Sequence, residues 1–351
     1  MKITSVSAVY PRYRGVPRSW RTNLWQIVVR VETDTGVTGY GYGGGGKAAV
    51  EVVNGHFDEV ITGAALNSTD DIASLWDTLY DASIPYGRKG IAIMALSGVD
   101  LALWDALGKA ERKPVASLIA GNGPVKDRVR AYATGADTEW YAELGFTAHK
   151  MPHRWNGSEA DFDSAVEAAA KARRAFGQDA EVMFDVYMSW DSDVTVDMAQ
   201  RLSEYRIHWF EDILTPDDLA ENAALRPEVS PVLIAGGEHE FTPIGFRDVA
   251  RTGAYDVWQP DITWCGGITA GIEITKMGIE AGAQVVPHRG GEIWGLHLIA
   301  ASECEDFGEV LPGTRDGERD DLWLGEPDAV NGYLEIHDEP GFGVTPDESM
   351  L

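Results

Sequence analysis

Apolar and polar positions follow two different patterns along this chain, and the change occurs near residue 128. Before it, segments rich in β-branched and aromatic residues are typical of antiparallel strands, which we place at residues 3–10, 25–33 and 37–42. The segment Asp34–Gly36 predicts the turn between the last two strands. Apolar residues at helical spacing then predict helices between residues 47 and 120, most clearly at 72–80 and 91–107. Residues 1–122 are therefore predicted to form an α+β domain.

After residue 128, short apolar segments alternate with amphipathic helices. One helix is predicted to begin at Ser158, with Asp161 at capping-box spacing, and another carries Pro243 in its first turn. Repeated strand–helix units predict an α/β fold with a parallel sheet, and eight strands are the number that closes a barrel. We assign residues 123–317 to this barrel and residues 318–351 to a return onto the first domain. The eight strands are placed at 129–134, 147–151, 182–185, 208–211, 232–236, 256–259, 284–287 and 308–311.

Composition excludes several classes of function. The 351 residues carry 29 basic and 56 acidic side chains, a net charge of −27, so we expect no nucleic-acid partner and no anionic membrane partner. Two cysteines, Cys265 and Cys304, are too few for a disulfide framework or a cysteine zinc site. The apolar segment 91–107 contains Asp100 and Asp105, which indicates a buried helix rather than a membrane span. Since the N-terminus also lacks a signal sequence, we expect a cytoplasmic protein.

Ionisable residues stand at the ends of consecutive predicted barrel strands. The intervals between them are 26, 27, 23, 27 and 21 residues, each about the length of one strand–helix unit. The strands of a parallel barrel open at one mouth, where barrel active sites are built, so these side chains should converge there. One acid at a strand end is usually a helix cap, but a series in one register favours a functional site. The series is Asp185, Glu211, Glu238, Asp261 and His288, with Glu309 inside the last strand.

The first three members of the series predict a metal site. Asp185, Glu211 and Glu238 end neighbouring strands, which lie about 4.8 Å apart, so their carboxylates should crowd together. Crowded carboxylates raise one another's pKa unless a cation neutralises them. Oxygen ligands select a hard cation, and Mg²⁺ fits because it keeps positions open for water and substrate. Zn²⁺ is disfavoured because no histidine or cysteine joins the three.

The next two members predict an acid/base pair. Asp261 and His288 end neighbouring strands, and a carboxylate beside an imidazole fixes its tautomer and raises its basicity. Lys150 ends the second strand, across the barrel from His288, where it could stabilise an anionic intermediate. Either His288 or Lys150 could be the principal base. Glu309 could hold a substrate carboxylate or an intermediate by a hydrogen bond, provided that it is protonated.

This order of residues resembles the enolase superfamily, mandelate racemase group, over nearly the whole chain. The stretches FDVYMSW, WFEDILTPDD, GEHEFTPIGFRD and QPDITWCGGIT resemble rhamnonate dehydratase and related acid-sugar dehydratases. The resemblance implies a modified TIM barrel of the (β/α)7β type with an N-terminal capping domain that the C-terminal tail completes. It also implies one Mg²⁺ per chain on Asp185, Glu211 and Glu238, and His288–Asp261 as the acid/base dyad.

The expected activity is a Mg²⁺-dependent dehydratase that converts an acid sugar to a 2-keto-3-deoxy acid. A racemase or epimerase of the same superfamily would need a second base, and Pro152 stands where many relatives carry a second lysine. The other rival is a catalytically silent regulator that binds a metal or a sugar acid. We also expect a homo-oligomer. Candidate substrate-binding residues are His239, Arg21, Trp20 and Trp294.

A glycine-rich segment imitates two nucleotide-binding motifs. Gly39–Gly44 fits G-x-G-x-x-G, and Gly41–Lys47 fits most of a P-loop, but Ala48 replaces the hydroxyl residue that would hold Mg²⁺. Both motifs require a strand that opens a βαβ unit, whereas the strand here belongs to an antiparallel hairpin. We therefore expect no nucleotide, and we interpret the segment as a mobile loop that closes over the barrel mouth as a lid.

The acidic composition predicts that salt stabilises the protein. Nine lysines stand against 30 aspartates, which suits either a salt-rich cytoplasm or an ordinary acidic bacterial protein. Because salt screens repulsion between surface carboxylates, the melting temperature should rise with KCl and level off near about 1 M, where the Debye length is about 3 Å. Differential scanning calorimetry from low to molar KCl tests this expectation. A melting temperature that stays flat or falls would show that the acidity does not limit stability.

Overall fold

The computed structural model describes residues 1–13, 19, 21–317 and 322–351. Its N-terminal part is a three-stranded antiparallel sheet in the order β1-β2-β3, packed against helices. The three strands agree with the predicted ones to within about two residues, and the helices predicted at 72–80 and 91–107 lie inside α3 and α4. The elements are β1 (Ile3–Val9), β2 (Ile27–Thr33), β3 (Thr38–Gly43), α1 (Gly46–Val52), the π-helix η1 (Val53–Phe57), α2 (Asp58–Ile61), α3 (Thr69–Ser83), α4 (Ile91–Glu111) and α5 (Val115–Ala120).

The second part is a curled parallel sheet flanked by helices. Within the described residues, eight parallel strands lie in the order β10-β9-β8-β7-β6-β5-β4-β11, and all eight predicted barrel strands are confirmed. The elements are β4 (Arg128–Thr134), α6 (Thr138–Glu143), β5 (Ala148–Pro152), α7 (Glu159–Phe176), β6 (Glu181–Asp185), α8 (Ser192–Arg201), the 3₁₀ helix η2 (Ser203–Tyr205), β7 (Trp209–Glu211), α9 (Leu219–Val229), β8 (Leu233–Gly236), α10 (Thr242–Thr252), β9 (Val257–Trp258), α11 (Gly267–Glu280), β10 (Gln284–Val285), α12 (Ile293–Ala301) and β11 (Gly308–Val310).

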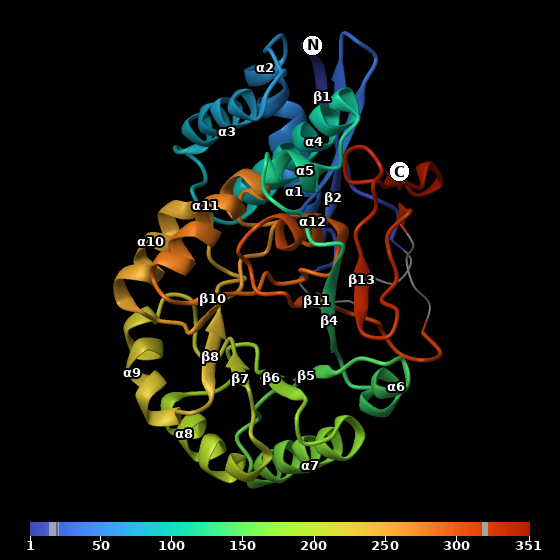
Figure 1. Ribbon diagram of the computed structural model, residues 1–351. Helices are drawn as coiled ribbons and strands as arrows, with labels where there is room; N and C mark the ends of the chain where they lie inside the picture. The colour runs from blue at the N-terminus through green and yellow to red at the C-terminus, as the bar shows by residue number, and fades with distance from the viewer. Residues whose placement is uncertain (14–18, 20, 318–321) are drawn as a thin grey trace.

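Two backbone hydrogen bonds link the segments around β10 and β11, the strands at the two ends of this order. Glu305 N donates to Val285 O at 3.0 Å, and Gly291 N donates to Glu309 O at 2.8 Å. Seven strand–helix units followed by a final strand make the expected (β/α)7β arrangement, with helices α7 to α11 around the sheet (Figure 1). The local signals also hold, since Ser158 and Asp161 form the predicted capping box and Pro243 lies in the first turn of α10.

A layer of side chains, about one from each strand, fills the inside of the barrel. Large aromatic rings and smaller apolar residues fill this layer together, so the barrel is a packed core rather than a pore. Its members are Tyr132, Ala148, Met183, Trp209, Ala235, Val257, Val286 and Phe307, and all are buried. The charged residues stand above this layer, at the carboxyl ends of the same strands.

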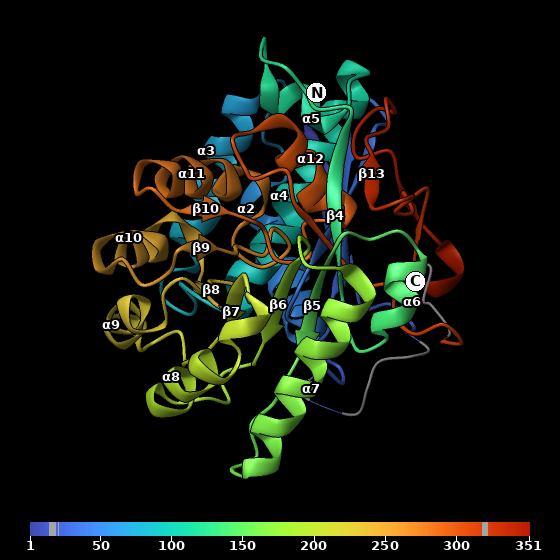
Figure 2. The same cartoon turned by 60° about the horizontal axis from the view of Figure 1, so that its bottom comes forward.

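The C-terminal tail contacts both parts of the chain. Strand β13 (Tyr333–Glu335) pairs antiparallel with β4 of the barrel, and β12 (Trp323–Leu324) pairs with β14 (Thr345–Pro346). The tail also bonds to the first part, where Val115 N donates to Gly341 O at 2.8 Å. Figures 1 and 2 show the red tail beside β4, and the chain ends at the 3₁₀ helix η3 (Glu348–Met350). The domain limits at residues 122 and 317 stay a prediction.

Helix α4 is the central helix of the first part. It is the one helix of the described residues that is long and apolar enough to cross a membrane, but 89% of its apolar 18-residue stretch is buried inside the protein. Its two acids are satisfied internally. Thr269 donates its hydroxyl to Asp100 Oδ1 at 2.5 Å, and Lys109 pairs with Asp105 at 2.6 Å. This is the pattern of a core helix, as the sequence predicts.

The glycine-rich segment is a packed strand, and the prediction of a mobile lid is wrong. Gly39, Gly41 and Gly43 lie on β3 and face the backbone of α4. A Cβ atom on Gly41 would stand 2.1 Å from Gly98 O, so only glycine lets the strand approach the helix this closely. The alternating glycines therefore serve packing within the first part of the chain.

This packing predicts that Gly41→Ala destabilises the fold strongly. The added methyl group must push α4 away, which should lower the free energy of unfolding by about 3 kcal/mol, as overpacked cores do. Gly55→Ala is the matched control, because a Cβ there meets nothing within 4 Å, and its effect should be below about 1 kcal/mol. Urea unfolding of both variants measures the difference. Equal stabilities would mean that β3 and α4 separate easily, as a lid would require.

Candidate active site

The barrel strands bring the predicted ionisable residues to one end of the sheet. Asp185 and Glu211 end β6 and β7 and are direct partners in the strand register. Glu238, Asp261 and His288 follow β8, β9 and β10 by two or three residues. Lys150 lies on β5 and Glu309 on β11. Residues far apart in the sequence thus converge, because every strand contributes its carboxyl end to the same mouth.

Asp261 and His288 form the predicted hydrogen-bonded pair. His288 Nδ1 lies 2.9 Å from Asp261 Oδ2, and the other carboxylate oxygen accepts from the backbone N and the hydroxyl of Thr263, each at 2.7 Å. His288 Nε2 is turned toward the carboxylate cluster and lies 3.1 Å from Glu238 Oε2. Burial lowers the pKa of His288, but Glu238, Asp261 and Glu309 outweigh burial and raise it to about 10.

Lys150 is clamped between two buried carboxylates. Its Nζ pairs with Glu211 and lies 2.8 Å from Glu309 Oε1, and all three side chains are 1% exposed. Burial alone would lower the pKa of Lys150, but the two glutamates raise it well above the ordinary value. Lys150 is therefore a fixed positive charge within the site.

Glu309 is held as an anion. Thr134 donates its hydroxyl to Oε1 at 2.6 Å, and the backbone N of Arg289 donates to Oε2 at 2.8 Å. Burial raises the pKa of Glu309, but Lys150 and His288 lower it to about 2. The prediction that Glu309 acts as a protonated hydrogen-bond donor is therefore not supported, because its neighbours are donors themselves.

Of the three predicted metal ligands, Glu211 is already engaged by other side chains. Burial and the neighbouring carboxylates raise the pKa of Asp185, and they raise that of Glu211 to about 7. Glu211 Oε2 accepts from Gln259 Nε2 at 2.7 Å and from Trp209 Nε1 at 3.1 Å. A buried carboxylate takes the nearest cation and donors, so here Glu211 turns to Lys150, Gln259 and Trp209.

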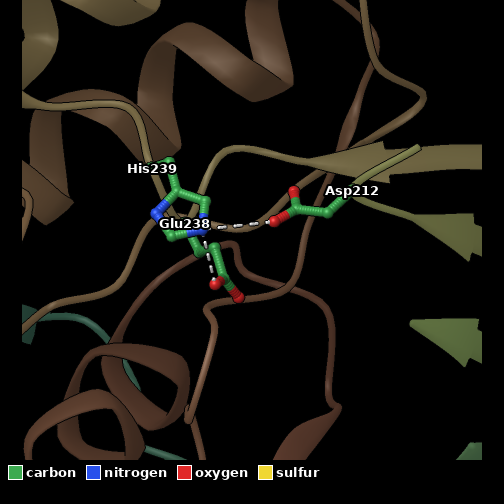
Figure 3. A group of neighbouring side chains, drawn as sticks. All are labelled: Asp212, Glu238 and His239. Carbon is green, nitrogen blue, oxygen red and sulfur yellow. Dashed lines mark ion pairs between the residues drawn. The ribbon is translucent and has the colours of Figure 1, made fainter. Parts of the chain in front are cut away.

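Asp212, Glu238 and His239 make the tightest group of potential metal ligands. Each residue offers one potential ligand atom, and the three atoms lie within 4.8 Å of one another (Figure 3). No other such group is found among the residues that the structure describes. His239 Nε2 lies 3.1 Å from Glu238 Oε1 and 3.6 Å from Asp212 Oδ2. Figure 3 shows the imidazole edge and both carboxylates pointing toward one another. The predicted trio Asp185, Glu211 and Glu238 does not form such a group here.

The cluster nevertheless has the chemistry of a cation site. Burial and the neighbouring acids raise the pKa of Asp212 well above its ordinary value. Its Oδ2 atom is buried without a hydrogen-bond donor. Buried oxygens crowded with like charge are the ligands that a hard cation would neutralise. The donor set of this mouth therefore fits a divalent cation.

The candidate substrate-binding residues divide into three cases. His239 lies inside the cluster, stacked near the Trp264 ring at 6.1 Å. Arg21 lies over the Trp25 ring, 4.8 Å from its centroid, and Trp25 in turn packs against Trp264. The Trp25 ring therefore connects Arg21 to Trp264. Trp294 is 1% exposed and packs on Tyr42, Trp323 and Phe342, which leaves no face for a substrate, so this prediction is corrected. Trp20 lies outside the described residues.

Several residues of the site were not identified from the sequence. Asp212 directly follows Glu211, and Gln259 comes two residues before Asp261, so position beside a strand-end acid was a usable signal for both. Arg289 follows His288, pairs with Glu292 at 2.6 Å and has Nη1 3.6 Å from Asp261. The role of Thr263 depends on a contact that no local pattern shows.

Comparison with known proteins agrees with this geometry. The chain is 35% identical to the L-rhamnonate dehydratase of Saccharopolyspora erythraea over 351 residues, covering 97% of this chain and 88% of that protein. The crystal structure of L-rhamnonate dehydratase from Gibberella zeae superposes with a TM-score of 0.90 at 30% identity, covering 99% and 94% of the two chains. A structure of rhamnonate dehydratase from the same fungus complexed with Mg has a TM-score of 0.88 at 29% identity, covering 99% and 95%.

Two family profiles cover most of the sequence. Residues 18–120 match the N-terminal domain of mandelate racemase and muconate lactonizing enzyme, and residues 133–350 match the enolase C-terminal domain-like family. These matches confirm the resemblance that the strand-end residues suggest. The chain therefore belongs to the mandelate racemase and muconate lactonizing enzyme family of the enolase superfamily.

Proposed function

We propose that this protein is a hydro-lyase that removes water from an acid sugar and yields a 2-keto-3-deoxy acid. The observation that carries the proposal is the His288–Asp261 hydrogen bond, which turns His288 Nε2 into a mouth lined by carboxylates. The names of the relatives support the reaction class, and L-rhamnonate is the first substrate to test.

A divalent cation, Mg²⁺, completes the proposed site. Asp185, Glu211 and Glu238 would hold it, with Asp212 and His239 beside them. When bound, the cation would offset the negative charge of the substrate's carboxylate as the neighbouring carbon loses its proton. Its presence in a similar enzyme of known structure supports this assignment.

The chain's own residues supply the proton transfers. A cation bound among the carboxylates would lower the pKa of His288 and leave its imidazole neutral. Neutral His288 Nε2 then removes the proton on the carbon next to the substrate carboxylate, and Asp261 holds the imidazole through Nδ1. Lys150 stabilises the negative charge that then spreads onto the carboxylate oxygens. The β-hydroxyl leaves as water with the proton that His288 returns, and the enol tautomerises to the 2-keto acid. No electrons enter or leave, so no redox cofactor is required.

Exposure favours His288 over Lys150 as the base. The His288 side chain is 14% exposed, whereas Lys150 is 1% exposed and engaged by Glu211 and Glu309. Pro152, at the end of the same strand as Lys150, has no group that could accept a proton. One accessible base fits an elimination, whereas a two-base racemase needs a second one on the opposite side of the substrate.

The proposal predicts that His288→Asn abolishes catalysis at the α-carbon. Dehydration and exchange of the substrate α-hydrogen with D₂O should both fall by at least about 10³-fold, because the proton acceptor is gone. Lys150→Met should lower the dehydration rate but retain measurable exchange. Proton NMR in D₂O with L-rhamnonate and a panel of other acid sugars measures both reactions. Exchange that survives in His288→Asn and disappears in Lys150→Met would reassign the base to Lys150, and a wild-type protein inert toward every acid sugar would favour a silent binder.

The metal site predicts that Glu238→Gln weakens Mg²⁺ binding and activity together. Removing one charged ligand should cost at least about tenfold in Mg²⁺ affinity. Isothermal titration with MgCl₂ measures the affinity, and activity after exhaustive chelation and Mg²⁺ addition measures the dependence. Glu240→Gln is a matched control, because Glu240 is buried two residues away but pairs with Lys89 at 2.7 Å instead of facing the cluster. Full activity of the chelated enzyme would contradict a metal-dependent reaction.

A further inference from the structure

A chain of hydrogen bonds leads from the N-terminal part of the protein to the acid/base dyad. Gln26, just before strand β2, donates from Nε2 to the hydroxyl of Thr263 at 2.8 Å. The Thr263 hydroxyl donates to Asp261 Oδ1 at 2.7 Å, and Asp261 Oδ2 accepts from His288 Nδ1 at 2.9 Å. Gln26, Thr263 and Asp261 are each at most 3% exposed, so water does not compete for these bonds.

A tryptophan fixes the direction of the first two bonds in this chain. Trp264 Nε1 lies 2.7 Å from Gln26 Oε1, and an indole nitrogen can only donate. The amide oxygen of Gln26 must therefore face Trp264, and its NH₂ group must face Thr263. Because the Thr263 oxygen accepts that bond, the single hydroxyl proton is directed at Asp261. Asp261 then faces His288 Nδ1 with both of its own oxygens engaged.

The same contacts position the aromatic wall of the site. The Trp264 ring contacts both site histidines, with its centroid 6.1 Å from that of His239 and 5.8 Å from that of His288. Gly44, at the end of β3, donates its backbone N to Thr263 O at 3.3 Å. The first part of the chain thus holds the loop after β9 through a side chain and through the backbone.

We propose that Gln26 is a positioning residue for the dyad, acting through Thr263 to hold Asp261 and hence His288. This inference rests on the proposed function for its effect on rate. Gln26 and Thr263 orient the dyad without adding charge to it, since the amide and the hydroxyl are neutral. Asp261 retains the backbone N of Thr263 as a donor, so the loss of the relay should weaken the dyad without breaking it.

Thr263→Val tests the relay, because it removes the hydroxyl and nearly keeps the shape. The kcat of the Mg²⁺-loaded enzyme should fall by about tenfold, as changes to partners one bond behind a working group do. KM should change by less than about threefold, since substrate contacts are kept. Thr263→Ser should restore kcat to within about threefold of the wild type. Gln26→Leu should lower kcat in the same direction by less, and it replaces Thr263→Val if that variant fails to fold.

Ser97→Ala is the matched control. Ser97 lies on α4, is fully buried and accepts from Gly266 N at 2.8 Å, so it also bonds the N-terminal part to the loop after β9. Among the described residues, the Ser97 hydroxyl bonds to Ile93 O and Gly266 N and not to Thr263 or Asp261. Its loss should lower the melting temperature but leave kcat unchanged. A loss of kcat in Ser97→Ala equal to that in Thr263→Val would overturn the relay, because any loosening of the contact would then suffice.

A second measurement separates this inference from the proposed function. The Nδ1 proton of His288 can be observed by NMR in protein labelled with ¹⁵N-histidine and loaded with Mg²⁺ alone, and His288→Asn assigns it. The resonance should shift or broaden in Thr263→Val and keep its position in Thr263→Ser and Ser97→Ala. If no acid sugar is turned over, the proposed function fails and this resonance alone decides the relay. An unchanged resonance in Thr263→Val would overturn it.

Discussion

The crowding of carboxylates in a poorly solvated barrel mouth is the constraint that organises this protein. Each carboxylate of the cluster makes its neighbours harder to ionise, and burial together with these neighbours raises the pKa values of Asp185, Glu211 and Asp212. The other two members of the cluster are Glu238 and Glu309. Such a cluster is unstable unless positive charge lies within it. The positive charges of the cluster are Lys150 and His288, with Arg289 at its edge, and the donor set has room for a divalent cation.

Burial makes each of these charges more effective. In a medium of low polarity a fixed cation such as Lys150 stabilises developing negative charge far better than it would in water. The N-terminal part covers one side of this mouth, where Gln26 donates to the Thr263 hydroxyl and Gly44 donates its backbone N to Thr263 O. The C-terminal tail bonds to both parts, and so it ties the cover to the barrel.

Much of this arrangement could be predicted from the sequence, because it depends on local periodicity. Strand–helix spacing placed all eight barrel strands and brought Asp261 and His288 to neighbouring positions. Periodicity could not show how surfaces distant in sequence fit together. The glycines of β3 were misread as a loop because their partner, α4, begins about fifty residues later. Trp294 was misplaced for the same reason, since its neighbours Tyr42 and Phe342 come from opposite ends of the chain.

The contacts that orient the dyad illustrate a division of labour between the two parts of the chain. The barrel supplies the charged groups, each delivered by its own strand. Among the described residues, the N-terminal part reaches Asp261 through neutral groups, the amide of its own Gln26 and the hydroxyl of the barrel residue Thr263. A lysine at position 26 would add a cation beside Asp261 and draw it away from His288, and a glutamate would add one more like charge to the mouth. A neutral amide whose direction Trp264 dictates fixes the geometry and leaves the charge balance of the cluster unchanged.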